Sequence, residues 1–309
     1  MKIIFFSHYF YPHIGGVEKH VLELSKILIK QKHEVTIITE KFDDKLKDEE
    51  IYQRIKIIRF KYPKQRYIGL IYIWKFIFDN RKMIFEANII HIHDVFIWYL
   101  PFKFLYPDKK FFVTIHGLEW SNPFSPSAIW QKKLAVKFAK GSIGVGKFLE
   151  KYIGCKCNLL IYGAANIPER NFKKMHEITF IGRLSKDTGI LNFLKYLKTN
   201  RNIKVNFVGD GELKEKCKKY GKIYGFTDPI KFLQKSEYIV PGGYLACLEA
   251  FVYKAKVKVF WDTKLKEDYW KMSPIYKFIE NKDTDGAYRY AKENTYQNLA
   301  GKYLQLWQS

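Results

Sequence analysis

The sequence predicts an α/β protein with two domains, each built around a mostly parallel β-sheet. Short apolar segments alternate with amphipathic or polar stretches along the chain, which is the pattern of successive β-α-β units. Between residues 162 and 176, Gly163, Pro168 and a polar run interrupt this alternation, as expected of a connection between domains. A length of 309 residues also fits two domains of about 150 residues each.

The N-terminal half begins with an apolar strand at residues 3–6 and a helix at residues 16–32. Within this helix, Val17, Val21 and Leu24 recur at helical spacing. Further strands are predicted at residues 35–38, 55–60, 89–92, 111–115 and 159–161. These elements define a Rossmann-like N-terminal domain over residues 1–165.

The C-terminal half repeats the same alternation. Strands are predicted at residues 178–181, 205–208, 238–240 and near 257–260. They define a second Rossmann-like domain over residues 166–287. Residues 288–309 follow the last strand and are predicted to be helical.

The composition predicts a folded protein of a reducing compartment. Hydrophobic residues make up 47% of the chain and aromatic residues 17%, which excludes a disordered protein. The four cysteines are too few and too scattered for a disulfide framework. The chain begins without a secretory leader, and no apolar run is long enough to span a bilayer. We therefore expect a cytoplasmic protein.

The net charge of +23 implies an anionic partner. Residues 51–165 carry 19 basic and 6 acidic side chains, so much of the excess is local. A solvated lysine surface, an anionic membrane surface at the inner membrane face and a polyanion all fit this pattern. Nucleic acid is not the expected partner because no nucleic-acid-binding signature accompanies the charge, although glycosylation of DNA stays open.

A pair of glycines, Gly15 and Gly16, stands where the first strand leads into the first helix. Glycines let the backbone approach a ligand closely, and a helix N-terminus offers unpaired N–H groups to an anion. The pair therefore fits a diphosphate. It is neither a dinucleotide-binding nor a Walker motif, so a simple turn is the alternative.

Several motifs in order resemble family 4 glycosyltransferases, which are retaining enzymes of the GT-B fold. The first is Tyr-Pro-His-Ile-Gly-Gly-Val-Glu-Lys-His-Val-Leu-Glu-Leu at residues 11–24, followed by Lys-His-Glu-Val-Thr at 32–36. The others are Ile-Ile-His-Ile-His-Asp (89–94), Val-Thr-Ile-His-Gly (113–117), Phe-Ile-Gly-Arg-Leu-Ser (180–185), Phe-Val-Gly-Asp-Gly (207–211) and Leu-Glu-Ala (248–250). The resemblance implies two Rossmann-like domains facing a central cleft, with the last helix packing back on the first domain.

The resemblance also implies a function and a set of site residues. The expected reaction moves a hexose from a nucleotide diphosphate sugar to a hydroxyl acceptor on a lipid or glycan. Gly15 and Gly16 match the loop that approaches the donor diphosphate, and His116 matches the catalytic-site histidine beside the transferred sugar. Arg183 matches the phosphate-binding arginine, and Glu249 matches the glutamate that binds the ribose hydroxyls. No metal ion or other cofactor is expected.

Two departures from the family pattern concern the donor site. Pro241 stands where the family's first signature glutamate binds the donor sugar, and Thr188 replaces a phosphate-binding lysine. Lys186, three residues after Arg183, is expected to reach the phosphates instead. These departures leave open a catalytically weakened GT-B homologue that acts as a binding module. A polyanion-associated or nucleic-acid-associated protein is the other alternative.

Two further segments have competing interpretations. His91 and His93, one residue apart on a strand, point to the same face, but two ligands do not make a metal site. Residues 67–78 are apolar on nearly every side of a helix and have basic flanks. Such a helix is either buried, which we expect, or packed against an anionic lipid surface.

Overall fold

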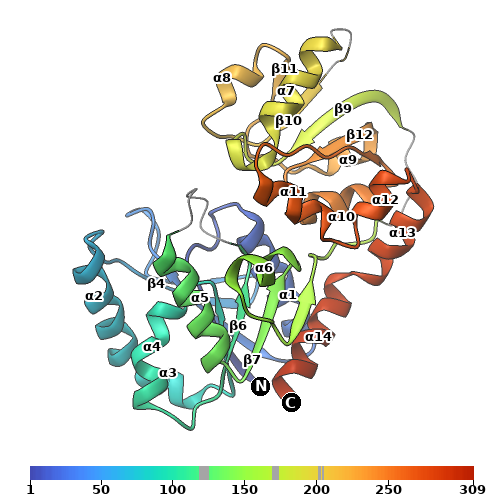
Figure 1. The fold of residues 1–309 in the computed structure, drawn as a ribbon. Helices are drawn as coiled ribbons and strands as arrows, with labels where there is room; N and C mark the ends of the chain where they lie inside the picture. The colour runs from blue at the N-terminus through green and yellow to red at the C-terminus, as the bar shows by residue number, and fades with distance from the viewer. Residues whose placement is uncertain (118–124, 169–173, 201–202, 204) are drawn as a thin grey trace. The chain divides into compact units, whose positions relative to one another are not determined.

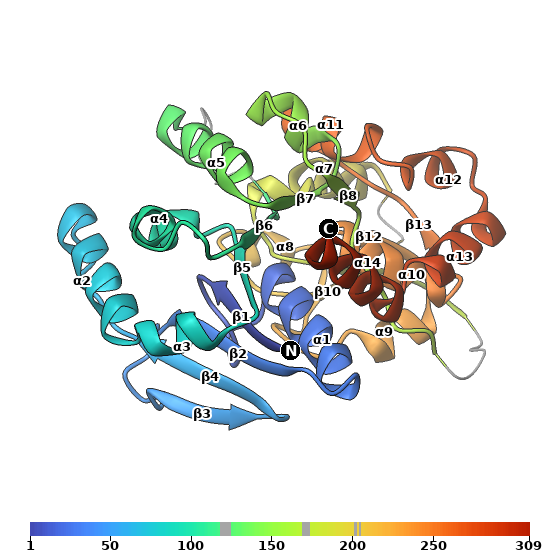
Figure 2. The same cartoon turned by 90° about the horizontal axis from the view of Figure 1, so that it is seen from below.

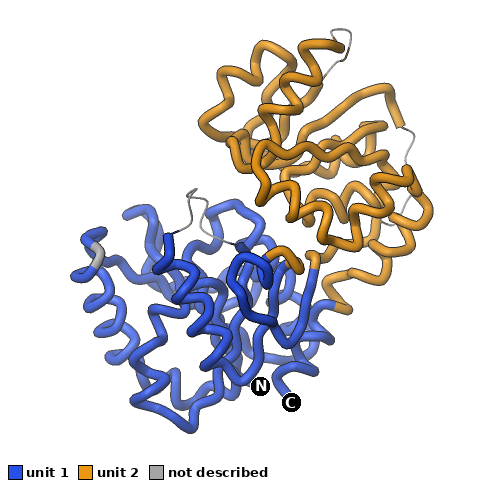
Figure 3. The backbone as a smooth tube through the Cα atoms, viewed as in Figure 1, with its two compact units in different colours: residues 1–145, 149–161, 299–309 blue, residues 146–148, 162–298 orange. Residues whose placement is uncertain are grey.

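A computed structural model describes residues 1–117, 125–168, 174–200, 203 and 205–309 of the chain (Figure 1). The chain forms two compact units (Figure 3). Unit 1 comprises residues 1–145, 149–161 and 299–309, and unit 2 comprises residues 146–148 and 162–298. Each unit contains one sheet of mainly or wholly parallel strands, which confirms the predicted α/β class.

Unit 1 is built on a sheet that has eight strands in the described chain, in the order β3-β4-β2-β1-β5-β6-β7-β8. The strands are β1 (Lys2–Ser7), β2 (Glu34–Glu40), β3 (Glu49–Tyr52), β4 (Ile55–Phe60), β5 (Ile89–His93), β6 (Phe111–Ile115), β7 (Gly141–Val145) and β8 (Leu159–Ile161). All neighbours pair in parallel except β3, which runs antiparallel to β4 at the edge. The order reverses between β1 and β5, a switch point of the kind where Rossmann-like sheets bind ligands.

Helices cover both faces of this sheet. They are α1 (Gly16–Lys30), α2 (Arg66–Asp79), α3 (Arg81–Glu86), α4 (Phe96–Leu105), α5 (Pro126–Phe138) and α6 (Phe148–Ile153). α1 and the C-terminal helix α14 (Tyr296–Gln308) lie on one face, and α3, α4 and α5 lie on the other (Figure 2). The central strands are buried along their length because both faces are covered.

Unit 2 has a parallel sheet of five strands in the described chain, in the order β11-β10-β9-β12-β13. The strands are β9 (Met175–Ile181), β10 (Val205–Val208), β11 (Gly221–Ile223), β12 (Ser236–Pro241) and β13 (Lys256–Val257). The helical segments are η1 (Lys186–Thr188), α7 (Ile190–Thr199), α8 (Lys214–Cys217), α9 (Ile230–Lys235), α10 (Tyr244–Val252), α11 (Lys264–Lys271), α12 (Tyr276–Glu280) and α13 (Thr284–Glu293). Phe180, Phe193 and Phe207 contact one another in a core of this unit, and each is fully buried.

α14 connects the end of the chain to the first domain. Its residues from Leu299 onward belong to unit 1, and Tyr303 and Trp307 are buried there. The helix lies close to β7 because that strand has glycine at its start. A Cβ atom at Gly141 would be only 2.8 Å from Leu306 Cδ1, so a larger residue would push the helix away.

The apolar helix at residues 67–78 differs from the expectation that it is buried. It is α2, and only one side of it, with Ile73 and Ile77, is buried. Its other side exposes large apolar side chains, namely Tyr67, Ile68, Ile71, Tyr72 and Phe78. We call these five residues the α2 surface. In the described part of the chain, no helix is both long and apolar enough to cross a bilayer.

Candidate functional site

Gly15 and Gly16 lie where β1 leads, through a loop, into α1. Gly15 is the N-cap of α1 and Gly16 is its first residue. The carboxylate of Glu18 folds back over Gly15, so a side chain at that position would collide with it. Glu18 Oε1 also lies 2.8 Å from His13 Nδ1. A carboxylate thus occupies the positive end of the helix, the place where the sequence predicts a diphosphate.

His116 follows β6, and the side chain of Asp94 fixes its backbone. Asp94 Oδ1 accepts a hydrogen bond from the His116 N–H at 3.1 Å and another from Lys132 Nζ at 2.9 Å. Lys132 is 6% exposed, so this ion pair is nearly buried. Asp94 itself has a left-handed backbone, with φ of 62°. The Asp94 of the 89–94 motif therefore holds the loop that carries His116.

His116 lies within a cluster of imidazole rings from three elements. His93 Nδ1 on β5 is 2.9 Å from His116 Nε2, and the ring centroid of His20 on α1 is 4.8 Å from that of His116. His91, two residues before His93, has its ring centroid 5.0 Å from that of His93, so both do share one face. Gly16 and His20 lie on one helix, so α1 links the glycine loop to this cluster.

Burial keeps these imidazoles neutral. It lowers the pKa of His116 to about 3, with Lys132 adding to the effect. Burial likewise holds the pKa of His20, His91 and His93 well below the ordinary value. One nitrogen each from His20, His93 and His116 lies within 4.8 Å of the others, a spacing that a metal ion could use. Two of these residues already share a hydrogen bond that a metal ion would have to break.

Arg183 follows β9 in unit 2, beside the loop after β12. Its guanidinium Nη2 donates to Asp187 Oδ2 at 2.6 Å and is about half exposed. A Cβ atom at Gly182 would be 2.9 Å from the Cα atom of Gly242, so glycines let these two loops touch. Arg183 is therefore held at the carboxyl edge of the sheet, where α/β folds bind ligands.

Thr188, which replaces the family's phosphate-binding lysine, and Lys186, its expected substitute, have different environments. Thr188 is buried, and its Oγ1 donates to the Ser185 carbonyl at 2.7 Å. It therefore closes its own turn and is not available for a phosphate. Lys186 is exposed on η1.

Lys266 is a cation at this edge that the sequence analysis did not select. Its Nζ donates to the Gly242 carbonyl at 2.7 Å and lies 4.0 Å from the centroid of the Tyr269 ring. The side chain is 3% exposed and forms no ion pair within the described residues. Burial is the main reason that its pKa falls to about 7; the charge of Asp187 opposes this shift and that of Arg183 adds to it. A buried amine without a carboxylate is a candidate for binding an anion.

The segment after Pro241, the residue that stands in place of the family's first signature glutamate, is in contact with α11. Pro241 ends β12, and the Tyr244 N–H at the start of α10 donates to the Tyr269 hydroxyl at 2.6 Å. Glu249 lies half buried in the second turn of α10. The structure thus brings Arg183, Gly242 and Lys266 together in unit 2. No sequence motif marks Lys266, since lysines are frequent throughout the chain.

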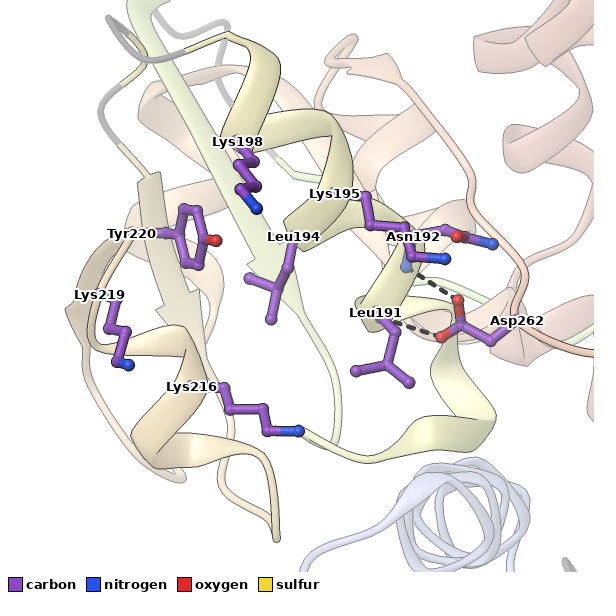
Figure 4. A pocket seen from close by; sticks show the side chains of 9 residues that line it. All are labelled: Leu191, Asn192, Leu194, Lys195, Lys198, Lys216, Lys219, Tyr220 and Asp262. Atoms are coloured by element: carbon purple, nitrogen blue, oxygen red, sulfur yellow. Dashed lines mark hydrogen bonds between the residues drawn. The ribbon is translucent and has the colours of Figure 1, made fainter.

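A separate pocket of about 500 Å³ lies against α7 and α8 (Figure 4). None of the predicted site residues lines it; its lysines are Lys195, Lys198, Lys216 and Lys219. Asp262 accepts hydrogen bonds from the Leu191 and Asn192 N–H groups at 2.9 and 2.8 Å. The N-terminus of α7 is therefore capped by the protein's own carboxylate and does not offer a phosphate site.

The fold and these loops define a two-domain protein of the GT-B class, and comparisons with known proteins agree. Residues 14–157 match the family model for Glycosyltransferase Family 4. An uncharacterized glycosyltransferase from Methanocaldococcus jannaschii is 26% identical over 264 residues, covering 72% of this chain and 67% of that protein. These matches support assigning the chain to glycosyltransferase family 4.

Solved structures show the same fold over almost the whole chain. Sucrose-phosphate synthase from Thermosynechococcus elongatus superposes with a TM-score of 0.76 at 13% identity, covering 99% of this chain and 98% of that chain. HepE from Anabaena, solved with UDP and glucose, superposes with a TM-score of 0.69 at 14% identity and covers 99% of both chains. The predicted GT-B fold is confirmed.

Proposed function

We propose that this glycosyltransferase moves a hexose from a nucleotide diphosphate sugar to a hydroxyl acceptor on a lipid or glycan, with retention at the anomeric carbon. The observation that carries the proposal is the pair of cations, Arg183 and Lys266, beside the Gly242 backbone at the carboxyl edge of the unit 2 sheet. HepE, which has the same fold, was solved with UDP and glucose. Within this site, the negative charge of a diphosphate would meet two cations.

The proposed chemistry depends on positioning and electrostatics. Arg183 presents a planar fork suited to phosphate oxygens, and Lys266 adds a point charge in a dry environment where it acts strongly. Lys266 is thus a better candidate than Lys186 for the role left open by Thr188. Glu249 would accept hydrogen bonds from the ribose hydroxyls. Stabilising the leaving diphosphate accounts for most of the barrier reduction in such a site.

The acceptor side of the reaction would lie in unit 1. The neutral His116 ring can exchange a hydrogen bond with a sugar hydroxyl without adding charge. The leaving phosphate would take the proton of the acceptor hydroxyl on the same face of the sugar, so no protein base is required. Gly15 and Gly16 would approach the diphosphate once Glu18 turns away from the start of α1.

We also propose that no metal ion takes part, because Arg183 and Lys266 supply the charge that a divalent cation would otherwise provide. We expect transferase activity to be unchanged, within about twofold, after dialysis against EDTA. The assay compares the dialysed protein with the same sample supplemented with Mg²⁺ or Mn²⁺. A loss of activity on chelation that Mg²⁺ or Mn²⁺ restores would contradict this.

A thermal-shift screen of UDP, GDP and ADP sugars tests the function. A specific rise in melting temperature identifies the donor, and release of the nucleoside diphosphate with an acceptor present measures turnover. Arg183→Ala and Glu249→Ala should abolish the shift, whereas Lys186→Ala and the exposed Arg289→Ala should retain it. A shift without turnover on any acceptor would favour a weakened homologue that only binds, the alternative that Pro241 and Thr188 support.

A further inference from the structure

A continuous chain of hydrogen bonds runs from the C-terminal helix to the histidine cluster in unit 1. Trp307 Nε1 lies 2.9 Å from His91 Nδ1, and His91 Nε2 lies 2.7 Å from Thr114 Oγ1. Thr114 Oγ1 is 2.8 Å from the Tyr303 hydroxyl, which is 2.9 Å from His20 Nε2. All five side chains are buried. The chain thus joins α14, β5, β6 and α1.

Trp307, at the start of the chain of hydrogen bonds, determines which atoms donate and which accept as far as Thr114. An indole N–H can only donate, so His91 Nδ1 must accept and its proton must be on Nε2. That N–H then donates to Thr114 Oγ1. If the Thr114 hydroxyl donates to Tyr303 and Tyr303 donates to His20, every N–H and O–H from Trp307 to Tyr303 has an acceptor. His20 then accepts at Nε2 and carries its own proton on Nδ1, an atom that is not among the buried polar atoms left without a partner.

If the hydrogen bonds between Thr114 and His20 ran in the opposite direction, one donor would be left without an acceptor. If His20 donated to Tyr303, and Tyr303 to Thr114, the Thr114 hydroxyl would need another acceptor. Its Oγ1 has no further hydrogen bond within the described residues. An unpaired donor in a buried site is unfavourable, so the first direction is preferred.

We propose that Tyr303 and Trp307 are positioning residues for His116. They hold the neighbouring His20 as the neutral tautomer protonated on Nδ1, packed edge to face against the His116 ring. His93 binds His116 from the other side through the 2.9 Å contact of their ring nitrogens. The C-terminal helix thereby sets the tautomer of a ring that packs against His116. This inference rests on the proposed role of His116 for its effect on catalysis but not for the tautomer itself.

Nuclear magnetic resonance of protein with ¹⁵N-labelled histidine tests the tautomer directly. The wild-type spectrum should show His20 with its proton on Nδ1, the signals being assigned by their loss in His20→Asn. In Tyr303→Phe, His20 loses its donor at Nε2, and we expect a population protonated on Nε2 to appear. Tyr99→Phe is the matched control because Tyr99 is also fully buried in unit 1 and its hydroxyl has no hydrogen-bond partner among the described residues.

Kinetics separate positioning from simple stabilisation. We expect Tyr303→Phe to lower kcat at least about tenfold with the donor KM nearly unchanged, as outer partners of functional histidines do. Tyr99→Phe should leave both unchanged. A wild-type His20 protonated on Nε2, an unaltered tautomer in Tyr303→Phe, or a changed tautomer with normal kcat would each overturn the proposal. If no transferase activity exists, the spectra still decide whether α14 sets the tautomer.

Discussion

In the proposed donor site, Lys266 would serve ligand binding at a cost to stability. Its amine has one carbonyl and two aromatic faces as neighbours, which compensate only part of the lost hydration. Sites evolved for anions commonly keep such a charge. The bound diphosphate, rather than the folded protein alone, would then be its electrostatic partner.

The depressed pKa of Lys266 predicts a pH-dependent stability. The pKa of Lys266 is about 7 in the folded protein, whereas the ordinary value, expected for the unfolded chain, is 10.5. Between these two pH values the unfolded chain therefore binds more protons than the folded protein. The free energy of unfolding should therefore rise with pH from 7 to 10.5, by up to about 1.4 kcal/mol per pH unit. Lys266→Met should lose this contribution. Urea unfolding of both proteins across this range measures it, and equal slopes would contradict the prediction.

Asp94 is the residue on which the geometry of the His116 loop depends. Asp94→Ala removes the acceptor of the His116 N–H and leaves Lys132 as a nearly buried, unpaired cation. We expect a loss of about 2–3 kcal/mol in unfolding free energy. The double variant Asp94→Ala, Lys132→Met should recover part of it, and the exposed Asp108→Ala is the control. Strictly additive effects of the two substitutions would show that the pair is not coupled.

The sequence predicts some of the site residues better than others. Arg183 and His116 stand at the ends of apolar strands, so their place at the sheet edge follows from the strand pattern. Lys266 could not be predicted, because its contact with Gly242 joins residues 24 positions apart in sequence across the β12–α11 connection. Tyr303 and Trp307 are likewise ordinary apolar positions of a helix until the histidines they contact are known.

At the scale of elements, strand prediction succeeded where apolar residues are consecutive. The predicted segments 55–60, 111–115 and 159–161 coincide with β4, β6 and β8. β7 was not predicted because Gly141 and Gly144 weaken the strand signal, although close packing against Leu306 and Cys157 requires them. β3 and β11 are short and polar. The strand near residues 257–260 is only Lys256–Val257 in the structure.

We propose that the α2 surface binds an anionic membrane. Tyr67 is 74% and Ile71 60% exposed, and the Arg81 guanidinium lies 4.6 Å from the centroid of the Phe78 ring. Exposed aromatic and aliphatic side chains with nearby cations suit the interface of an anionic bilayer. Such docking would bring a lipid acceptor to unit 1.

Vesicle sedimentation at low salt tests this surface. We expect binding to vesicles with anionic lipid and at least about tenfold weaker binding by Ile71→Glu, Tyr72→Glu, because both charges would enter the apolar interface. Phe226→Glu in unit 2 is the matched control, since Phe226 is 55% exposed. Equal sedimentation of all three proteins, or none by the wild type, would remove the membrane from the proposal.

For the whole molecule, the division into two α/β units was predictable because the strand series is interrupted once. The path of the last residues, which complete unit 1, was implied by the family resemblance alone, because nothing in the composition of α14 marks the strands that it contacts. Its periodic apolar positions indicate a helix with a buried face. The partner of that face depends on tertiary structure alone.

The contribution of α14 to unit 1 can be measured with two tryptophans. Trp307 contacts His91 on β5 and is only 7% exposed, whereas Trp130 on α5 is 56% exposed. Trp307→Ala should lower the unfolding free energy by about 3–5 kcal/mol, since it leaves a cavity and frees His91 Nδ1. Trp130→Ala should change it by less than about 0.5 kcal/mol. Circular dichroism during denaturant unfolding distinguishes the two, and similar losses would argue against a stabilising role for α14.

Tyr303 and Trp307 belong to the core of unit 1. The order in which the ribosome synthesises the chain therefore affects when this unit can complete its core. The strands of unit 1 emerge first, but the helix that completes their hydrogen-bond chain is translated only after all of unit 2. At typical elongation rates the interval is on the order of ten seconds. During that time, His91 Nδ1 and His20 Nε2 lack the hydrogen-bond donors that α14 supplies, and the face of unit 1 that this helix covers stays open to solvent.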